Sequence, residues 1–374
     1  MRFRQHEAHA RRRAGRLLVA FAVALAGVLV GVNLLAIGAA WIVSPGVRAA
    51  GSWASVLSAL PPHFVLTNTL VVLLLVLGGA WLERARLADG GVAVARALGA
   101  RRVDASPPHA AERRLRHVVD ELALAAQCRA PALYVLDDES INACAAGFGR
   151  EDAALIVTQG ALRRLDRDEL QGVVAHELAH VLNEDLALDM RLCAYAGGVL
   201  VLHQFGRWLI GLAIPDDRAH RHNPIGFNPF LLAAGAVAVA VGAVGWLAAR
   251  LLHAATNRER EFLADATAVR LTRLPQGLGG ALRKILGTSR ARAGAAPTAS
   301  PAAWRHLWFD APAGLADWLA SHPPLRERIR RVLGHDAGPL SAPPREVDDE
   351  PAASPSAPPP ASELPPLEWP ARTL

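Results

Sequence analysis

The sequence predicts a mainly α-helical integral membrane protein, with about four transmembrane helices and a split α+β domain outside the bilayer. Three observations lead to this prediction. Hydrophobic residues make up 52% of the chain and the mean hydropathy is +0.21, which is high for a soluble enzyme. Four long apolar stretches carry much of that hydrophobicity. The segments between them combine helical spacing with short strand-like runs.

The first two apolar stretches are long enough to cross a bilayer. Leu17 to Val43 contains no charged residue, and Phe64 to Leu82 is interrupted only by the polar residues 67–69. A helix needs about 20 apolar residues to span the hydrocarbon core. A cleaved signal has an apolar region of only about 7–15 residues. The first stretch is therefore predicted to be a span.

The third and fourth apolar stretches differ in strength. Leu192 to Ile214 contains His203, Gln204 and Arg207, so it fits either a tilted crossing or a partly interfacial helix. Phe230 to Ala249 is free of charge and rich in alanine, valine and glycine. Small residues of this kind favour close packing of helices in lipid.

Arginines flank the first two spans unevenly, and this predicts the orientation. Six arginines lie within residues 1–16, Arg48 alone lies between the two spans, and five arginines lie within residues 84–102. Positive residues favour the cytoplasmic side. We expect a multi-pass protein of the cell (inner or plasma) membrane whose soluble part faces the cytoplasm. The net charge of +6 is explained by this role, and no nucleic-acid partner is expected.

The chain is expected to divide at the ends of these stretches. The predicted segments are a basic N-terminal segment (1–16), two transmembrane helices (17–82), a first soluble part (83–191), two transmembrane or membrane-associated helices (192–250), a second soluble part (251–338) and a proline-rich disordered tail (339–374). The first soluble part should contain a helix over 112–127 and strands over 132–136, 141–146 and 153–158. Three cysteines without C-x-x-C spacing fit small buried residues better than a disulfide framework.

The residues His176-Glu177-Leu178-Ala179-His180 form an H-E-x-x-H pattern on a predicted helix. Asp166 and Glu169 supply a capping box at the start of that helix. Residues at i and i+4 share one helical face, so both imidazoles can bind one metal ion, and Glu177 can act as the general base on a water in the fourth position. Zinc is the metal that this pattern indicates.

Catalytic zinc takes three protein ligands, so a third ligand is expected downstream. The best candidate is Glu261, with Asp265 four residues later on the same face as the acceptor for a ligating imidazole. On spacing alone, an ordinary charged helix face explains these two carboxylates equally well. The fallback ligands are His253, Asp185 and Glu184.

Four motifs in order resemble the M48 family of membrane metallopeptidases, in its HtpX-like branch and its CAAX prenyl endopeptidases. They are the strand 142–147 (N-A-C-A-A-G), the zinc helix 174–181, the segment Arg258 with 261–265 (E-F-L-A-D), and 321–325 (S-H-P-P-L) with Arg328 and Ile329. The resemblance covers about residues 83–331 and implies a zincin-like catalytic domain with Glu261 as the third zinc ligand.

The resemblance also implies roles for residues outside the zinc ligands. It makes His322 and Arg328 candidates for stabilising the transition state. It implies that the strand carrying Asn142, Ala143 and Cys144 binds substrate. Two positions depart from the family pattern: Asn257 stands where serine is usual, and Cys144 where phenylalanine is frequent.

The expected function is hydrolysis of peptide bonds in proteins or peptides, including misfolded membrane proteins, by one zinc ion per chain. This is the chemistry of a metalloendopeptidase in membrane protein quality control. The alternatives are a catalytically silent zinc-binding scaffold or sensor, and a prenyl-protein endopeptidase. An intact Glu177 argues against the scaffold, because a structural zinc site needs no base.

Overall fold

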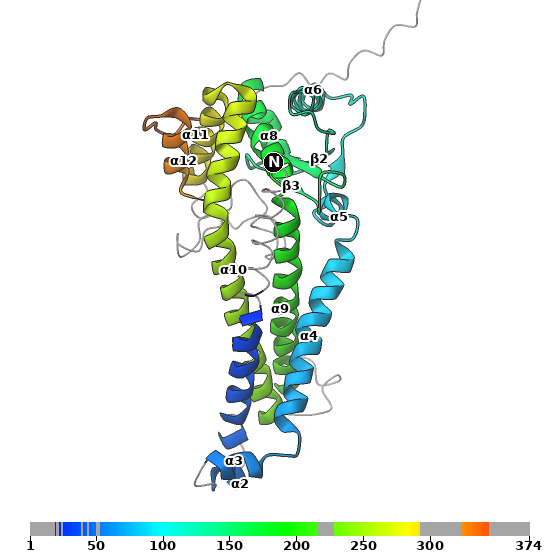
Figure 1. Ribbon diagram of the computed structural model, residues 1–374, viewed down its shortest axis with the longest axis vertical. Coiled ribbons are helices and arrows are strands. Elements are labelled where there is room, and N and C mark those ends of the chain that lie inside the picture. Colours follow the sequence, from blue (N-terminus) through cyan, green and yellow to red (C-terminus); the bar gives the residue numbers. More distant parts are fainter. Residues whose placement is uncertain are drawn as a thin grey trace, which may run out of the picture.

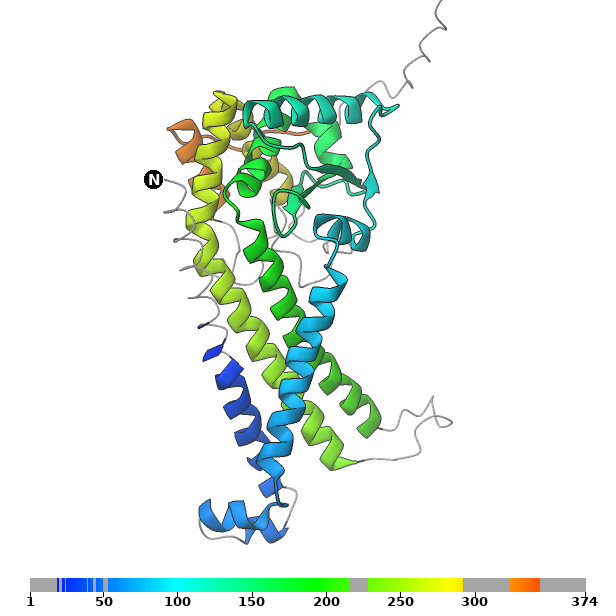
Figure 2. The same ribbon diagram turned by 45° about the vertical axis from the view of Figure 1, so that its right-hand side comes forward.

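The computed structural model describes residues 45–49, 53–214, 228–291 and 323–343, together with 19, 22–23, 25–38 and 40–42. Within these residues, four helices are long and apolar enough to cross a membrane. They are Leu25–Ile42, α4 (Phe64–Arg86), α9 (Leu186–Ala213) and the first part of α10 (Pro229–Thr272). Figures 1 and 2 show these helices as an elongated bundle, with a compact α+β part at one end and the short helices α2 (Pro45–Arg48) and α3 (Trp53–Ala59) at the other. The prediction of a mainly α-helical membrane protein is therefore confirmed.

The third and fourth apolar stretches are parts of longer helices than the sequence indicated. Helix α9 begins at Leu186, six residues before the expected start. Helix α10 does not end with its apolar stretch but continues through 44 residues, about 66 Å at 1.5 Å per residue. It starts at a capped N-terminus, where the Asn228 side chain accepts hydrogen bonds from two backbone N–H groups, with Pro229 in the first turn. One continuous helix thus joins a membrane span to the soluble part.

Helices α9 and α10 approach each other closely because glycine faces glycine. A Cβ atom on Gly206 would lie 2.7 Å from the Gly235 carbonyl oxygen and 2.6 Å from the Val239 nitrogen. Any larger residue at either glycine would force the two backbones apart. Elsewhere in the bundle, Asn33 of the first span donates from Nδ2 to Thr69 Oγ1 of α4 at 3.0 Å.

A four-stranded sheet forms the centre of the soluble part. Its strands are β1 (Arg101–Arg102), β2 (Ala132–Leu136), β3 (Ala143–Ala146) and β4 (Ala154–Thr158), in the order β1-β2-β4-β3. Strands β2 and β4 are parallel, while the β1–β2 and β3–β4 pairs are antiparallel. The order places β3 at an edge of the sheet.

The two faces of the sheet pack against different layers. Alternate residues of the strands, such as Ala143 and Val157, pack into one core with α6 (Ala110–Ala125) and α8 (Arg167–Leu182). Their neighbours, such as Ile156, pack on the other face with α5 (Gly91–Ala97) and the start of α9. The expected helix and strands are present, with ends shifted by at most two residues, whereas β1 and the short α7 (Gln159–Arg164) were not anticipated.

Helix α8 begins as the sequence predicted. Asp166 accepts from the Glu169 backbone N–H at 2.8 Å, and Glu169 accepts in return from the Asp166 N–H at 2.8 Å. The same Glu169 carboxylate receives Lys284 Nζ at 2.5 Å from α11 (Pro275–Ala291). Next to α11 lies α12 (Leu325–Leu333), which carries Arg328. The start of α8 is therefore held both by its own capping box and by the ion pair with Lys284 of α11.

Three expected features lie wholly or partly outside the described residues. These are the basic segment 1–16, His322 with Ser321, and the tail beyond residue 343. The described start of the tail is ordered against α11, where Leu340 N–H donates to the Arg283 carbonyl at 3.0 Å.

Candidate active site

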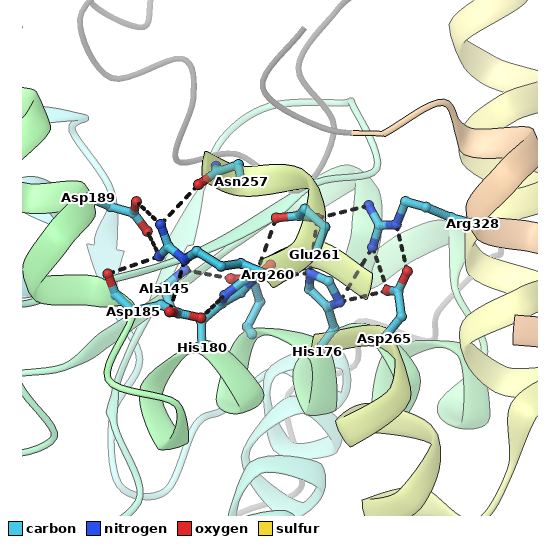
Figure 3. A network of polar contacts seen from close by, with 11 residues as sticks. Ala145, His176, His180, Asp185, Asp189, Asn257, Arg260, Glu261, Asp265 and Arg328 are labelled. Atoms are coloured by element: carbon cyan, nitrogen blue, oxygen red, sulfur yellow. Dashed lines mark hydrogen bonds and ion pairs between the residues drawn. The ribbon is translucent and has the colours of Figure 1, made fainter. Parts of the chain in front are cut away.

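His176 and His180 lie one turn apart on α8 and point in the same direction (Figure 3). Their Nε2 atoms are 3.2 Å apart. Both side chains are largely buried, with 1% and 13% of their surface exposed. The i, i+4 spacing therefore produces the paired imidazoles that the sequence indicated.

Glu261 of α10 completes a group of three side chains, each of which offers one ligand atom within 4.8 Å of the others. Its Oε2 lies 3.6 Å from His176 Nε2, and its Oε1 lies 3.5 Å from His180 Nε2. A tetrahedral zinc ion with ligands at about 2.0–2.1 Å would place those ligands about 3.3 Å apart. The donor set and its spacing therefore fit a single zinc ion. Glu261 is 81 residues from His180 in the sequence, so the return of the chain through α9 and α10 brings the three side chains together.

The second nitrogen of His176 is held by Asp265. Nδ1 lies 2.9 Å from Asp265 Oδ1, as expected from the four-residue spacing between Glu261 and Asp265. Asp265 in turn accepts from Arg328 Nε at 3.0 Å and Nη2 at 2.8 Å. Burial alone would raise the pKa of Asp265, but Arg328 and His176 outweigh burial and lower it. The carboxylate therefore stays charged and fixes the His176 ring with Nε2 facing Glu261.

The second nitrogen of His180 faces a different carboxylate. Nδ1 lies 3.3 Å from Asp185 Oδ2, at the turn between α8 and α9. Burial opposes protonation of His180, but hydrogen bonding to Asp185 and Glu261 outweighs burial and raises its pKa to about 10. Asp185 was a fallback ligand in the sequence, and here it orients the ring. The other fallback carboxylate, Glu184, pairs with Arg150 at 3.7 Å near the surface.

Glu177 lies between the zinc-ligand group and the edge strand β3. Its Oε2 accepts a hydrogen bond from the Ala145 backbone N–H at 2.8 Å, and only 3% of the residue is exposed. Ala145 directs this N–H away from β4, so the outer edge of β3 faces the candidate base. The base and the edge strand thus form one side of the site.

The three residues predicted to bind substrate lie on β3, as Ala143 and Cys144 do, or just before it, as Asn142 does. Asn142 Oδ1 accepts from the Ala143 N–H at 3.0 Å, which orders the start of the strand. The Cys144 side chain is fully buried and packs with Met190 and Cys193 on the face of the sheet away from α8. The substitution at this position therefore changes the packing under the sheet.

Arg260 and Asp189 belong to the polar network around His180, but the sequence analysis assigned no role to either. Arg260, adjacent to Glu261, is buried and contacts both Asp185 and Asp189. The family-like motif draws attention to Arg258 instead, which is exposed. The sequence gives no signal that separates Arg260 from Arg258, because an apolar neighbour, Leu263, is itself 49% exposed.

The profile of peptidase family M48 matches residues 109–336 of the chain. Curated relatives match as well, and the three named here are each described as "Protease HtpX homolog". The relative from Streptococcus gordonii is 36% identical over 224 residues, which are 58% of this chain and 72% of the relative. The relatives from Levilactobacillus brevis and Caldanaerobacter subterraneus subsp. tengcongensis are each 36% identical, over 217 and 223 residues, and cover 58% of this chain and 71% and 70% of their own length.

The chain belongs to peptidase family M48. It is accordingly a membrane protease that acts on protein substrates, and membership of this metalloprotease family implies a metal cofactor. No solved structure matches the chain. The His176, His180 and Glu261 group is the set of side chains among the described residues that could hold the metal.

Proposed function

We propose that this protein is a zinc metalloendopeptidase in which His176, His180 and Glu261 bind zinc and Glu177 is the general base. The observation that carries the proposal is the group of three side chains, whose nearest nitrogen and oxygen atoms lie 3.2–3.6 Å apart, with Glu177 beside it. Two imidazoles and one carboxylate form a donor set of catalytic zinc, which keeps a fourth position open.

A zinc ion bound by this group would polarise a substrate carbonyl and lower the pKa of a bound water to about 7. The protein supplies the proton transfers. Because Glu177 Oε2 is engaged by the Ala145 N–H, Oε1 takes the proton from the attacking water and passes it to the leaving amine. The hydrogen bond from Ala145 also keeps the carboxylate from rotating away from the reacting atoms.

We infer that an extended substrate adds along the outer edge of β3, where Asn142, Ala143 and Cys144 lie. An edge strand has one row of backbone groups that no neighbouring strand uses, and a peptide can pair with it. On this edge the Ala143 and Ala145 N–H groups donate to Asn142 Oδ1 and Glu177 Oε2, so a peptide would pair through the carbonyl oxygens of β3. Side-chain pockets then set the preference for particular residues. Stabilisation of the developing oxyanion is assigned to His322, which lies outside the described residues. Arg328 is fully buried and acts behind the ligands, through Asp265 and with Nη1 3.4 Å from Glu261 Oε2.

The expected setting is the cytoplasmic face of the cell membrane, with misfolded membrane proteins as substrates in quality control. The arginine distribution supports this orientation. The similarity to proteins described as HtpX homologues favours this role over prenyl-protein processing. Parallel cleavage assays with a prenylated peptide and with its unmodified form would separate the two.

The base assignment is tested with Glu177→Gln in the full chain. The variant should retain zinc and lose proteolysis by about 10²-fold or more, because it removes the base but no ligand. Glu184→Gln is the matched control, since Glu184 is a nearby glutamate that pairs with Arg150 outside the site. Near-normal turnover by Glu177→Gln would refute the assignment, and absence of zinc from the wild-type protein would refute the proposed function.

A further inference from the structure

Arg260 lies at the centre of a buried charge cluster on the side of His180 away from the metal position. Four of its N–H groups make hydrogen bonds: Nη1 to Asp189 Oδ1 at 3.0 Å and to Asn257 Oδ1 at 2.9 Å, and Nη2 to Asp189 Oδ2 at 2.8 Å and to the Asp185 carbonyl at 3.0 Å. Its Nε lies 2.9 Å from Asp185 Oδ1. Only 6% of the Arg260 side chain is exposed. A planar guanidinium has a fixed fork of donors, so this many contacts determine its position.

The Asp185 carboxylate connects Arg260 to the zinc ligand. One oxygen, Oδ1, faces Arg260, and the other, Oδ2, faces His180 Nδ1 at 3.3 Å. Asp185 occupies the N-cap position of α9, where an aspartate usually caps its own helix. Among the described residues its side chain caps no N–H of α9 and turns toward His180 and Arg260 instead. The Asp185 carboxylate thus contacts His180 and Arg260 and does not cap α9.

The two zinc-binding imidazoles have parallel supports. His176 is held by Asp265, which is held by Arg328. His180 is held by Asp185, which is held by Arg260 (Figure 3). The first support comes from α12, whereas the second joins the first turn of α9 to the part of α10 that follows its candidate membrane span.

We propose that Arg260 is a positioning residue for the metal site, which fixes His180 through Asp185 and makes zinc binding depend on the packing of α9 against α10. The proposal rests on the proposed function for the identity of the metal ligands. Arg260 also compensates the charge of the buried Asp185 and of the partly buried Asp189.

The simpler view is that Arg260 only joins two helices. In that case a substitution lowers the stability of the fold and leaves the metal site of the folded molecules unchanged. If Arg260 acts through Asp185, the substitution weakens zinc binding by folded protein, and it does so only while Asp185 can orient His180. Removal of an outer partner of a ligating histidine costs 10–100-fold in metal affinity. Arg260 contacts this outer partner and not the histidine itself, so we expect its substitution to weaken zinc affinity by about tenfold.

The test is a double-mutant cycle on the full chain in detergent, with Arg260→Lys, Asp185→Asn and the double variant. The dissociation constant for zinc is measured by chelator competition. Lysine keeps the charge but cannot reproduce the fork, so Arg260→Lys should weaken zinc by about tenfold. Arg258→Lys is the matched control, because Arg258 is two residues away on the exposed face. Its dissociation constant should stay within about twofold of the wild-type value.

The double variant separates the two views. If Arg260 acts through Asp185, Arg260→Lys adds no further loss in the Asp185→Asn background. The visible absorption bands of the cobalt-substituted protein should also change in Arg260→Lys and stay unchanged in Arg258→Lys, since these bands report ligand geometry. Equal zinc affinity in Arg260→Lys and the wild type, or multiplicative losses in the double variant, would overturn the proposal.

Two controls keep the outcomes distinct. Thermal melting of each metal-free variant shows whether it folds. If Arg260→Lys does not fold, Asp189→Asn replaces it in the cycle, because it loosens Arg260 while leaving the Nε contact with Asp185 in place. Asp189→Asn should then weaken zinc binding on its own and add no further loss in the Asp185→Asn background. A wild-type protein that binds no zinc would contradict the proposed function itself, whereas tight wild-type binding with an unaffected Arg260→Lys contradicts only the role of Arg260.

Discussion

Replacement of Glu261 by alanine should release zinc, while the same change at Glu259 should not. Both glutamates lie in one short charged run of α10, but two steps of about 100° place them on nearly opposite sides of the helix. Glu261 is 2% exposed and lies 3.5–3.6 Å from the two histidine nitrogens. Glu259 is exposed. Only one of the two can therefore reach the metal.

The expected loss of zinc affinity in Glu261→Ala follows from the number of protein ligands. Zinc sites with four protein ligands bind with about 10–16 kcal/mol, which is about 3 kcal/mol per ligand if the ligands contribute equally. A loss of about 3 kcal/mol raises the dissociation constant by about 100-fold. Removal of Glu261 also leaves Arg328 Nη1 without the carboxylate that lies 3.4 Å away, which places a second positive charge near the metal. About 100-fold is therefore a lower bound.

The assay is zinc retained after gel filtration in a chelator of known affinity, with thermal melting to identify unfolded variants. Glu261→Ala should lose zinc and proteolysis together, and Glu259→Ala should match the wild type in both. Equal loss in both variants with lowered melting points would indicate general unfolding. Loss only in Glu259→Ala would show that the ligand assignment is wrong.

Three further outcomes are expected. Glu169→Gln should lower the melting temperature by roughly 10 °C, because a buried ion pair broken on one side costs about 3–5 kcal/mol and Lys284 stays buried; an unchanged melting point contradicts this. Reporter fusions after Arg102 and after Arg331 should both be cytoplasmic, and opposite results would show that α9 or α10 does not cross. Zinc affinity should fall as the pH falls below about 10, since the raised pKa of His180 means that zinc must displace a proton there, by about tenfold per pH unit for one proton; affinity independent of pH would contradict the coupling.

The parts of the site that are close in sequence could be predicted from the sequence. His176, Glu177 and His180 follow from one helical face, and the capping box of Asp166 and Glu169 places the start of that helix. These features depend on local geometry, which the spacing of residues determines. The lengths of the apolar stretches likewise indicated four spans.

The parts that depend on the return of the chain through the bundle could not be predicted. Spacing left Glu261 and Asp185 as alternative ligands, because their roles depend on how α10 lies beside α8. The structure places Asp185 at the outer nitrogen of His180 and Glu261 at the inner one. Arg258 and Arg260 are equivalent in the sequence, and only the contact with α9 shows which of them is buried.

The continuity of α10 gives the bilayer a mechanical connection to the metal site. Glu261 lies fourteen positions after Leu247, the end of the candidate span, which is about 21 Å of helix. A rigid rod of this length that tilts by about 5° moves its far end by about 2 Å, close to the length of a zinc–oxygen bond. Helices tilt to match the thickness of the surrounding lipid. A change in lipid composition that tilts α10 would thus move Glu261 relative to His176 and His180. Peptidase activity would then vary with bilayer thickness even where the protein and the zinc concentration are the same.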